Sequence, residues 1–322
     1  MSSVDYLKLY HVAQRYYQEG MTQAQISEKE NISRSQVSRM LDAARELGIV
    51  KIEVSLPEEM DRDSLGSFLQ ERLGLKRVIL AEVDPDMRDE RSISLAVAQE
   101  AAKVLPRLLR GCRVVGLGWG KTMYRMASCL SFRQNRRDTV FVPLIGASGN
   151  DNPFLQINTI IDRVAEHLNG DLCFTNLPAF REKNVPLTAY ENKRLLMLRE
   201  YWEQLEAAVF GIGSRAGSDE FFDEEIPSAS RQRILSEPVI GDVLSQFFYA
   251  DGRLLPADES YHTNAFPVER LKNLSHSICL AGGSEKTEAL LTAAKAGFFK
   301  ILITDTNTAG QMYDRIRNEV TL

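Results

Sequence analysis

The sequence predicts an α/β protein, with a small N-terminal helix-turn-helix domain at 1–55 and a larger, doubly wound domain with a mostly parallel sheet at 56–322. Residues 22–47 have the caps and the apolar spacing of two short helices joined by a tight turn. From Arg62 onward, short apolar runs alternate with amphipathic stretches. The segment 56–63 is polar and contains a proline, so we place the domain boundary there.

Each of the two short helices begins with a capping box, in which a hydroxyl residue precedes a glutamine by three positions. The pairs are Thr22 with Gln25 and Ser33 with Gln36. Asn31 lies between the helices and tolerates the left-handed backbone of a sharp turn. The second helix is predicted to bury one apolar stripe, formed by Val37, Met40, Leu41, Ala44 and Leu47.

The residues on either side of this pair of helices extend the prediction. Gly48 is placed to end the second helix, and 49–54 alternates apolar and charged residues like a short strand. An earlier helix, ended by Gly20, is predicted to pack beneath the pair through Leu9, Val12, Ala13, Tyr16 and Tyr17.

The polar side chains of the paired helices have the chemistry of a DNA-reading surface, because arginine suits guanine, glutamine suits adenine and serine suits phosphate. The predicted DNA contacts are Thr22, Gln23, Ser33, Arg34, Ser35, Gln36, Ser38 and Arg39. The spacing alone also permits an ordinary helical hairpin with a solvated face. Charge does not decide between the two, since 1–60 holds seven basic and nine acidic residues, with a basic surplus only in 33–51.

Composition narrows the class of protein. The chain has 322 residues and 44% hydrophobic content, with neither an apolar run of membrane length nor a secretory signal, so we expect a cytoplasmic protein. The sequence indicates no metal site and no cofactor, and the four histidines are dispersed. The cysteines form no CxxC pair, and we interpret them as structural thiols in a reducing compartment: Cys112, Cys129, Cys173 and Cys279.

The larger domain is predicted to contain parallel strands covered on both faces, because its apolar runs are short and continuous. Helices are predicted at 92–109, 155–168 and 285–296. Strands are predicted at 78–83, 112–117, 140–145, 172–175, 207–212, 278–281 and 301–304.

Three of these strands run directly into glycines, in VVGLGWGKT (114–122), VFGIGS (209–214) and LAGGSEKT (280–287). The carboxyl ends of parallel strands line one edge of a sheet, so the three loops should converge on one crevice. Lys121 and Lys286 lie in first turns of helices, where a positive charge is unfavourable unless it meets a negative group such as a phosphate. Each glycine alone could be a simple turn, and neither a P-loop nor GxGxxG is present.

These segments together resemble the SorC family of bacterial transcriptional regulators. The matching stretches include YYQEGMTQAQIS, SRSQVSRML, VVGLGWGKTM, VFGIGS, GDVLSQFFYADGRLL and ICLAGGSEKTEALLTAAKAGFFKILITDTNTA. The resemblance implies a C-terminal domain similar in fold to sugar-phosphate isomerases. It also implies a sugar or phosphorylated sugar effector, and dimers or tetramers on operator DNA.

The resemblance places the effector at the glycine loops. The implied residues are Gly118, Trp119, Gly120, Lys121, Thr122, Gly213, Asp242, Gly282, Gly283 and Lys286, with Gly241 beside Asp242. Lys286 and Asp242 would hold polar groups of the effector. The chain departs from the family pattern at Gly118, where a small hydroxyl residue is common, and at GGSEK, which replaces GGPHK. FPVER near Phe266 replaces a more apolar run.

The expected function is that of a DNA-binding regulator of a carbohydrate catabolic operon, controlled by a sugar effector and without enzymatic activity. Two alternatives stay open. One is a sugar-phosphate isomerase or lyase with an accessory helical domain, in which Asp242, Glu285 and Lys286 supply acid, base or Schiff-base chemistry. The other is a module that binds a ligand without contacting DNA.

Overall fold

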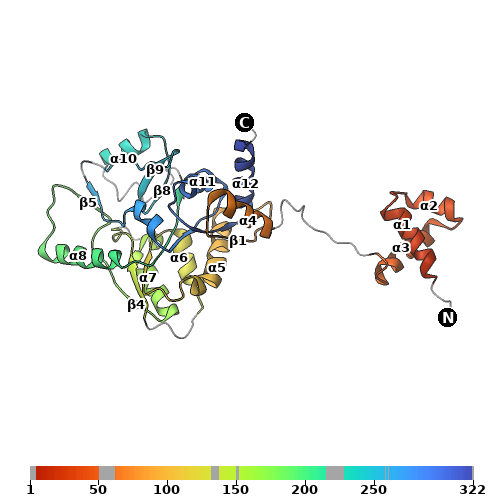
Figure 1. Cartoon of the computed structure of the whole chain (residues 1–322), viewed down its shortest axis with the longest axis horizontal. Helices are drawn as coiled ribbons and strands as arrows, with labels where there is room; N and C mark the ends of the chain where they lie inside the picture. Colours follow the sequence, from red (N-terminus) through yellow and green to blue (C-terminus); the bar gives the residue numbers. More distant parts are fainter. Residues whose placement is uncertain are drawn as a thin grey trace. The chain divides into compact units, whose positions relative to one another are not determined.

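The computed structural model describes residues 5–50, 62–131, 138–149, 152–214, 228–257, 259 and 261–320. The chain divides into two compact units, Met1–Glu58 and Glu59–Leu322, each of which is described by itself (Figure 1). The predicted boundary between 55 and 56 lies outside the described residues, as do 51–54 of the predicted short strand.

The first unit consists of three helices, α1 (Tyr6–Tyr17), α2 (Gln23–Glu30) and α3 (Arg34–Glu46). Both predicted capping boxes are present. The Thr22 hydroxyl accepts from the Gln25 backbone at 3.3 Å, and the Gln25 side chain accepts from the Thr22 backbone at 2.9 Å. Ser33 and Gln36 make the same pair at 3.2 and 2.9 Å. Asn31 has the predicted left-handed conformation, with φ 54°.

The core of this unit confirms most of the predicted apolar stripes and corrects them at their ends. Leu47 is 46% exposed and Tyr17 is 40% exposed, because α3 ends at Glu46 and Tyr17 is the last residue of α1. Ile49 and Val50 pack against the core but form no strand. The buried residues are Leu9, Val12, Ala13, Ile26, Val37, Leu41 and Ala44.

The second unit is built on a seven-stranded sheet with the order β1-β12-β11-β6-β2-β3-β4, in which every neighbouring pair is parallel. Each predicted strand corresponds to one strand of this sheet, so the predicted parallel topology is confirmed. The strands are β1 (Arg77–Ala81), β2 (Val114–Leu117), β3 (Val140–Pro143), β4 (Asp171–Leu172), β6 (Ala207–Phe210), β11 (His276–Leu280) and β12 (Ile301–Asp305).

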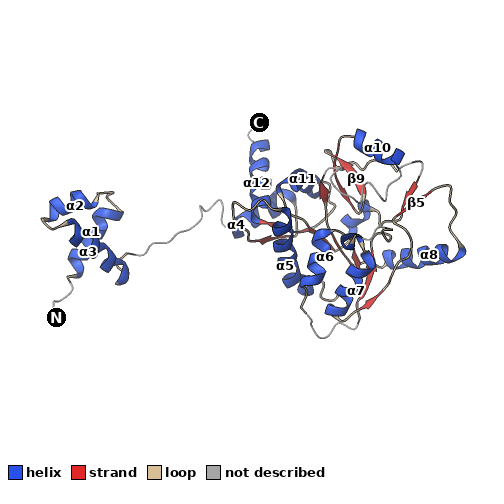
Figure 2. Ribbon diagram, turned by 180° about the vertical axis from the view of Figure 1, so that it is seen from behind, coloured by secondary structure: helices blue, strands red, loops and turns tan. Residues whose placement is uncertain are grey.

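Helices cover both faces of the sheet, which makes the fold doubly wound (Figure 2). Alternation along the strands assigns each face to its own core: Val115 and Leu117 pack with the first set of helices, and Val114 packs with the second. The first set is α5 (Glu90–Leu108), α6 (Lys121–Cys129) and α7 (Ile157–Leu168). The second set is α4 (Arg62–Leu73), α8 (Ala189–Glu203), α11 (Thr287–Lys295) and α12 (Thr306–Val320).

Several elements of this unit have no counterpart in the predicted pattern. The largest addition is an antiparallel sheet of three strands, β7-β8-β9, which follows β6 in the chain. Its strands are β7 (Gly213–Ser214), β8 (Val239–Val243) and β9 (Gln246–Tyr249). The remaining elements are β5 (Phe180–Glu182), which pairs with β10 (Tyr261–Thr263), the helix α10 (Ser228–Ser236), and the 3-10 turns η2 (Pro153–Leu155), η3 (Val268–Asn273) and η4 (Ser284–Lys286).

No helix within the described ranges is both long enough and apolar enough to cross a membrane.

Candidate functional site

The predicted DNA-contacting residues lie around the beginnings of α2 and α3, and several of them also hold the local structure. The Gln36 Oε1 atom accepts hydrogen bonds from the backbone and the hydroxyl of Ser33, at 2.9 and 3.1 Å. A bidentate contact with adenine requires both the oxygen and the nitrogen of the amide. Thr22, Ser33 and Gln36 therefore act first as caps that fix the start of each helix, and Ser35 bonds to Ser33 at 3.0 Å.

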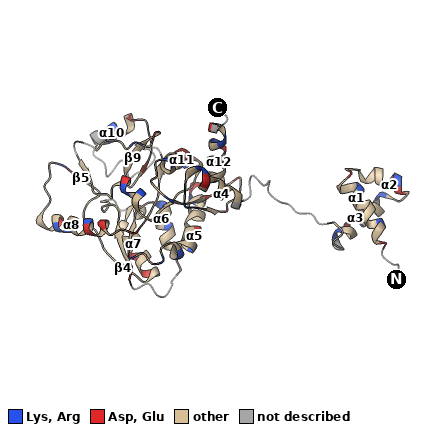
Figure 3. Ribbon diagram, in the orientation of Figure 1, with Lys and Arg blue, Asp and Glu red and all other residues tan. Residues whose placement is uncertain are grey.

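α3 carries three arginines, Arg34, Arg39 and Arg45, which make different contacts. Figure 3 marks the lysines and arginines of the chain in blue. Arg34 and Arg39 are exposed, and the Arg39 Nε atom donates to the Ser35 carbonyl of its own helix at 3.3 Å. Arg45 instead forms an ion pair with Asp42. Only the first two lie in the amino-terminal half of α3, beside the caps.

In the second unit, the three glycine loops follow β2, β6 and β11, which are neighbours in the sheet. The Gly118 backbone N–H donates to the Val209 carbonyl at 2.8 Å, which joins the first loop to β6. A methyl group built on Gly211 would lie 3.6 Å from the Leu280 carbonyl oxygen and 3.9 Å from the Trp119 carbonyl oxygen. The loops therefore converge at the carboxyl edge of the sheet, as the sequence predicts.

The first loop ends at Gly120, which has φ 123° and begins α6. Lys121 is paired within the chain, because its Nζ atom lies 3.4 Å from Glu90 Oε1 at the start of α5. Lys121 therefore has a negative partner within the chain, and its contact with an effector stays a prediction. Thr122 points inward, with its hydroxyl 2.9 Å from that of Ser94.

The third loop is hydrogen-bonded to Asp305, a fully buried residue at the end of β12. Its Oδ2 atom accepts from the Gly283 N–H at 3.2 Å and from the Thr308 hydroxyl at 2.6 Å, and its Oδ1 atom accepts from the Thr308 N–H at 2.8 Å. A methyl group on Gly282 would lie 2.3 Å from Oδ2. Asp305 was not among the predicted site residues, because it ends an apolar strand next to which no glycine signals a loop.

Lys286 lies at the junction of η4 and α11 and is half-buried. Its positive charge acts on Cys279 in β11. Burial raises the pKa of the Cys279 thiol strongly, and the positive charge of Lys286 opposes that rise. The lysine charge therefore acts on the carboxyl half of β11. All four cysteines are free thiols.

Asp242 belongs to the antiparallel sheet, where it pairs with Gly213. A methyl group on Gly213 would lie 1.9 Å from Asp242 Oδ1, so a larger residue here would displace the carboxylate. The Oδ2 atom accepts from the Ser245 N–H at 3.0 Å across the turn between β8 and β9. In that turn Leu244 and Ser245 both have positive φ, 51° and 58°, although glycine or asparagine usually occupies such positions.

The tip of this hairpin packs against the first glycine loop. A methyl group on Gly118 would lie 2.9 Å from Leu244 Cδ2 and 3.1 Å from Phe210 Cβ. Leu244 is 5% exposed, so its side chain fills the space that a residue larger than glycine would need. A residue larger than glycine at position 118 would therefore have to displace Leu244.

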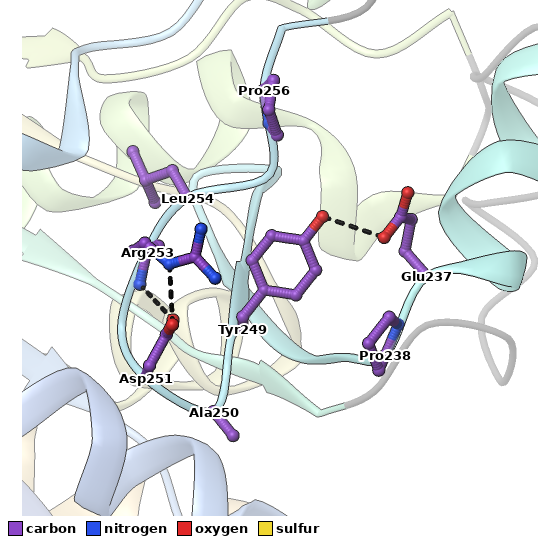
Figure 4. A pocket seen from close by; sticks show the side chains of 8 residues that line it. All are labelled: Glu237, Pro238, Tyr249, Ala250, Asp251, Arg253, Leu254 and Pro256. Atoms are coloured by element: carbon purple, nitrogen blue, oxygen red, sulfur yellow. Dashed lines mark hydrogen bonds and ion pairs between the residues drawn. The ribbon is translucent and has the colours of Figure 1, made fainter.

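A hollow of about 590 Å³ lies elsewhere on the second unit, over the end of β9 (Figure 4). Its charged groups are paired with their neighbours: the Tyr249 hydroxyl donates to Glu237 at 2.9 Å, and Arg253 donates to Asp251 at 2.7 Å. Leu254 and Pro256 complete its wall. None of its lining residues belongs to the three glycine loops.

The fold and the converging loops are those of a transcriptional regulator with a sugar-binding domain, as comparison with known proteins shows. Residues 59–313 match the family described as "Putative sugar-binding domain". The chain is 29% identical over 315 residues to the sorbitol operon regulator of Klebsiella pneumoniae, which covers 96% of this chain and 98% of that protein. It is also 29% identical over 299 residues to the deoxyribonucleoside regulator of Bacillus subtilis, with 92% of this chain and 94% of that protein covered.

Solved structures agree with these matches. The full-length sorbitol operon regulator SorC from Klebsiella pneumoniae superposes with a TM-score of 0.69 at 28% identity, covering 97% of this chain and 99% of that chain. A probable sor operon regulator from Shigella flexneri gives a TM-score of 0.67 at 25% identity, covering 77% of this chain and 97% of that chain. The protein belongs to the SorC family of transcriptional regulators with a sugar-binding domain.

Proposed function

We propose that this transcriptional regulator acts in the cytoplasm, binds operator DNA through α3 and controls a carbohydrate catabolic operon in response to a sugar or phosphorylated sugar. One observation carries the proposal. A capped pair of helices and a sugar-binding domain lie in one chain, and the likeness to the sorbitol operon regulator extends over both.

The DNA-binding part of the proposal rests on α3. The exposed Arg34 and Arg39 contact bases or phosphates, whereas the capping boxes of Thr22 and Ser33 set the direction of the helices. Gln23, Ser35, Gln36 and Ser38 lie beside them and complete the contact surface. Helix-turn-helix units read paired half-sites, so we propose that the protein acts as a dimer or tetramer.

The effector part rests on the convergence of the three glycine loops at the carboxyl edge of the sheet. We propose that residues on and beside these loops hold the sugar: Gly118 to Thr122, Gly213, Asp242, Gly282, Gly283 and Lys286. An effector shifts operator affinity only if it binds two arrangements of the protein with different affinities. The β8–β9 hairpin is suited to report its presence, because Leu244 and Asp242 connect the hairpin to the first and second loops.

The DNA-binding test compares two arginines of the same helix by fluorescence anisotropy on DNA from upstream of the gene. Arg39→Ala should weaken binding about tenfold and lower the salt dependence by about one unit. Arg45→Ala is the matched control, because Arg45 is paired with Asp42, and it should bind within about twofold of wild type. Equal binding by Arg39→Ala and wild type would refute the role given to α3.

The effector test is a thermal-shift screen of the full chain against sugars and their phosphates. A specific ligand should raise the unfolding temperature by mass action and should change operator binding in the same preparation. We also propose that the protein does not catalyse a reaction on its effector. Steady product formation from any sugar phosphate in the same panel would favour the isomerase or lyase alternative.

A further inference from the structure

Arg125 lies close to the first glycine loop, and it is not among the residues proposed above to hold the effector. It lies one turn after Lys121 on α6, the helix that begins at Gly120. Its guanidinium carbon lies 5.5 Å from the centre of the Phe154 ring. The Phe154 carbonyl in turn accepts from the Gly120 N–H at 2.9 Å, so Arg125, Phe154 and the loop form one contact group.

The Nη1 atom of Arg125 is buried and has no hydrogen-bond partner within the part of the chain that the structure describes. The ring of Phe154 attracts the positive charge, but it offers no strong acceptor for the N–H groups. A buried donor without an acceptor lowers stability, and the cost is greater for a charged group. Such a donor, beside the loops that are proposed to hold the effector, points to an acceptor that arrives with the ligand.

The neighbouring cations are already engaged. Lys121 lies 3.4 Å from the Glu90 carboxylate. Arg163 of α7 stacks 4.5 Å from the centre of the Tyr124 ring and donates to the Ser128 hydroxyl at 2.6 Å. Of these three cations around α6, Arg125 is the one that combines a buried guanidinium nitrogen with an unfilled hydrogen bond.

We propose that Arg125 binds an oxyanion, a phosphate monoester of the effector or free phosphate, at the start of α6. Planar guanidinium groups bind phosphate oxygens in pairs, and the amino-terminal end of α6 adds a favourable dipole. Because Nη1 is buried, the proposal requires neighbouring side chains, such as the half-buried Phe154 that stacks on the guanidinium, to shift when the phosphate binds. This inference rests on the effector crevice proposed above, and it assigns the anion-binding charge to Arg125 rather than to Lys121.

The test is calorimetric titration of the full chain with inorganic phosphate, comparing wild type with Arg125→Gln and Arg163→Gln. Arg125→Gln should weaken phosphate binding by at least about tenfold, the loss of a charged hydrogen-bonding pair. Arg163→Gln is the matched control on the same cluster and should bind within about twofold of wild type. A wild-type protein that binds no phosphate, or an Arg125→Gln variant that binds it equally well, would overturn the proposal.

A stability measurement separates ligand binding from a structural role. Without phosphate, Arg125→Met removes an unsatisfied buried donor and keeps an unbranched apolar side chain. It should therefore raise the unfolding temperature by about 2–4 °C. A structural role for the guanidinium predicts a lower unfolding temperature instead, and that result would overturn the proposal.

Two further arms identify the source of the phosphate and separate this inference from the proposed function. Glucose 6-phosphate and glucose are titrated beside inorganic phosphate. Tighter binding of the ester supports an effector phosphate, and equal binding of ester and phosphate supports a free phosphate site at Arg125. Operator binding is measured on the same preparations: its absence refutes the proposed function alone, because phosphate binding by Arg125 does not depend on DNA.

Discussion

The contact between Gly118 and Leu244 leads to a double-mutant prediction. A serine at 118 places its Cβ atom 2.9 Å from Leu244 Cδ2 and 3.1 Å from Phe210 Cβ, closer than packed carbons tolerate. Overpacking of this kind costs about 1–3 kcal/mol of unfolding free energy. Leu244 is 5% exposed, so Leu244→Ala alone removes a buried side chain. This change should lower the free energy of unfolding by about 2–5 kcal/mol.

The double variant should be less destabilised than the sum of the two single variants by about 1–2 kcal/mol, since removal of the leucine makes room for the serine. Urea unfolding followed by tryptophan fluorescence measures this, because Trp119 and Trp202, the two tryptophans of the chain, both lie in the second unit. Gly310→Ser is the matched control, because nothing lies within 4 Å of a methyl group built there. Additive costs within about 0.5 kcal/mol would refute the contact.

Three further outcomes are expected. Ser245→Gly should raise the unfolding free energy by up to about 1 kcal/mol in the same urea assay, since glycine adopts the positive φ of 58° without strain, whereas Ser245→Ala should give no gain. Burial and the positive charges of Lys76 and Lys300 lower the pKa of His276 in the folded protein. The unfolded chain therefore protonates this histidine more readily, and the free energy of unfolding should fall as the pH drops below about 6.5. His276→Gln should make the urea midpoint less dependent on pH between about 5 and 7. In native protein treated with iodoacetamide, peptide mass spectrometry should find Cys129, which is half-buried, alkylated before the three buried thiols, Cys112, Cys173 and Cys279.

Local patterns in the sequence were sufficient for much of this fold. Capping boxes involve residues three positions apart, so Thr22 with Gln25 and Ser33 with Gln36 could be predicted from sequence spacing alone. The continuous apolar runs likewise identified every strand of the parallel sheet. Leu47 was placed wrongly because the apolar spacing continues one residue beyond the end of α3, and periodicity carries no information about where a helix stops.

The candidate site was less predictable, because its decisive contacts join residues that are far apart in the chain. Glu90 neutralises Lys121 across 31 positions, and Asp305 reaches Gly283 across 22. The three-stranded antiparallel sheet was missed because β7 has only two residues and the β8–β9 turn uses Leu244 and Ser245 instead of glycine or asparagine. The glycine loops themselves were predictable because each follows an apolar strand.

The position of the three loops in the sheet has a consequence for how this protein can change over evolutionary time. β11, β6 and β2 each have a hydrogen-bonded neighbour on both sides, so a substitution within these strands disturbs the centre of the sheet. Mutations tolerated by selection must leave enough stability to fold. If the loops hold the effector as proposed, a change of effector is most accessible through the β8–β9 hairpin and the side chains after each strand, while the strands beneath them stay as they are.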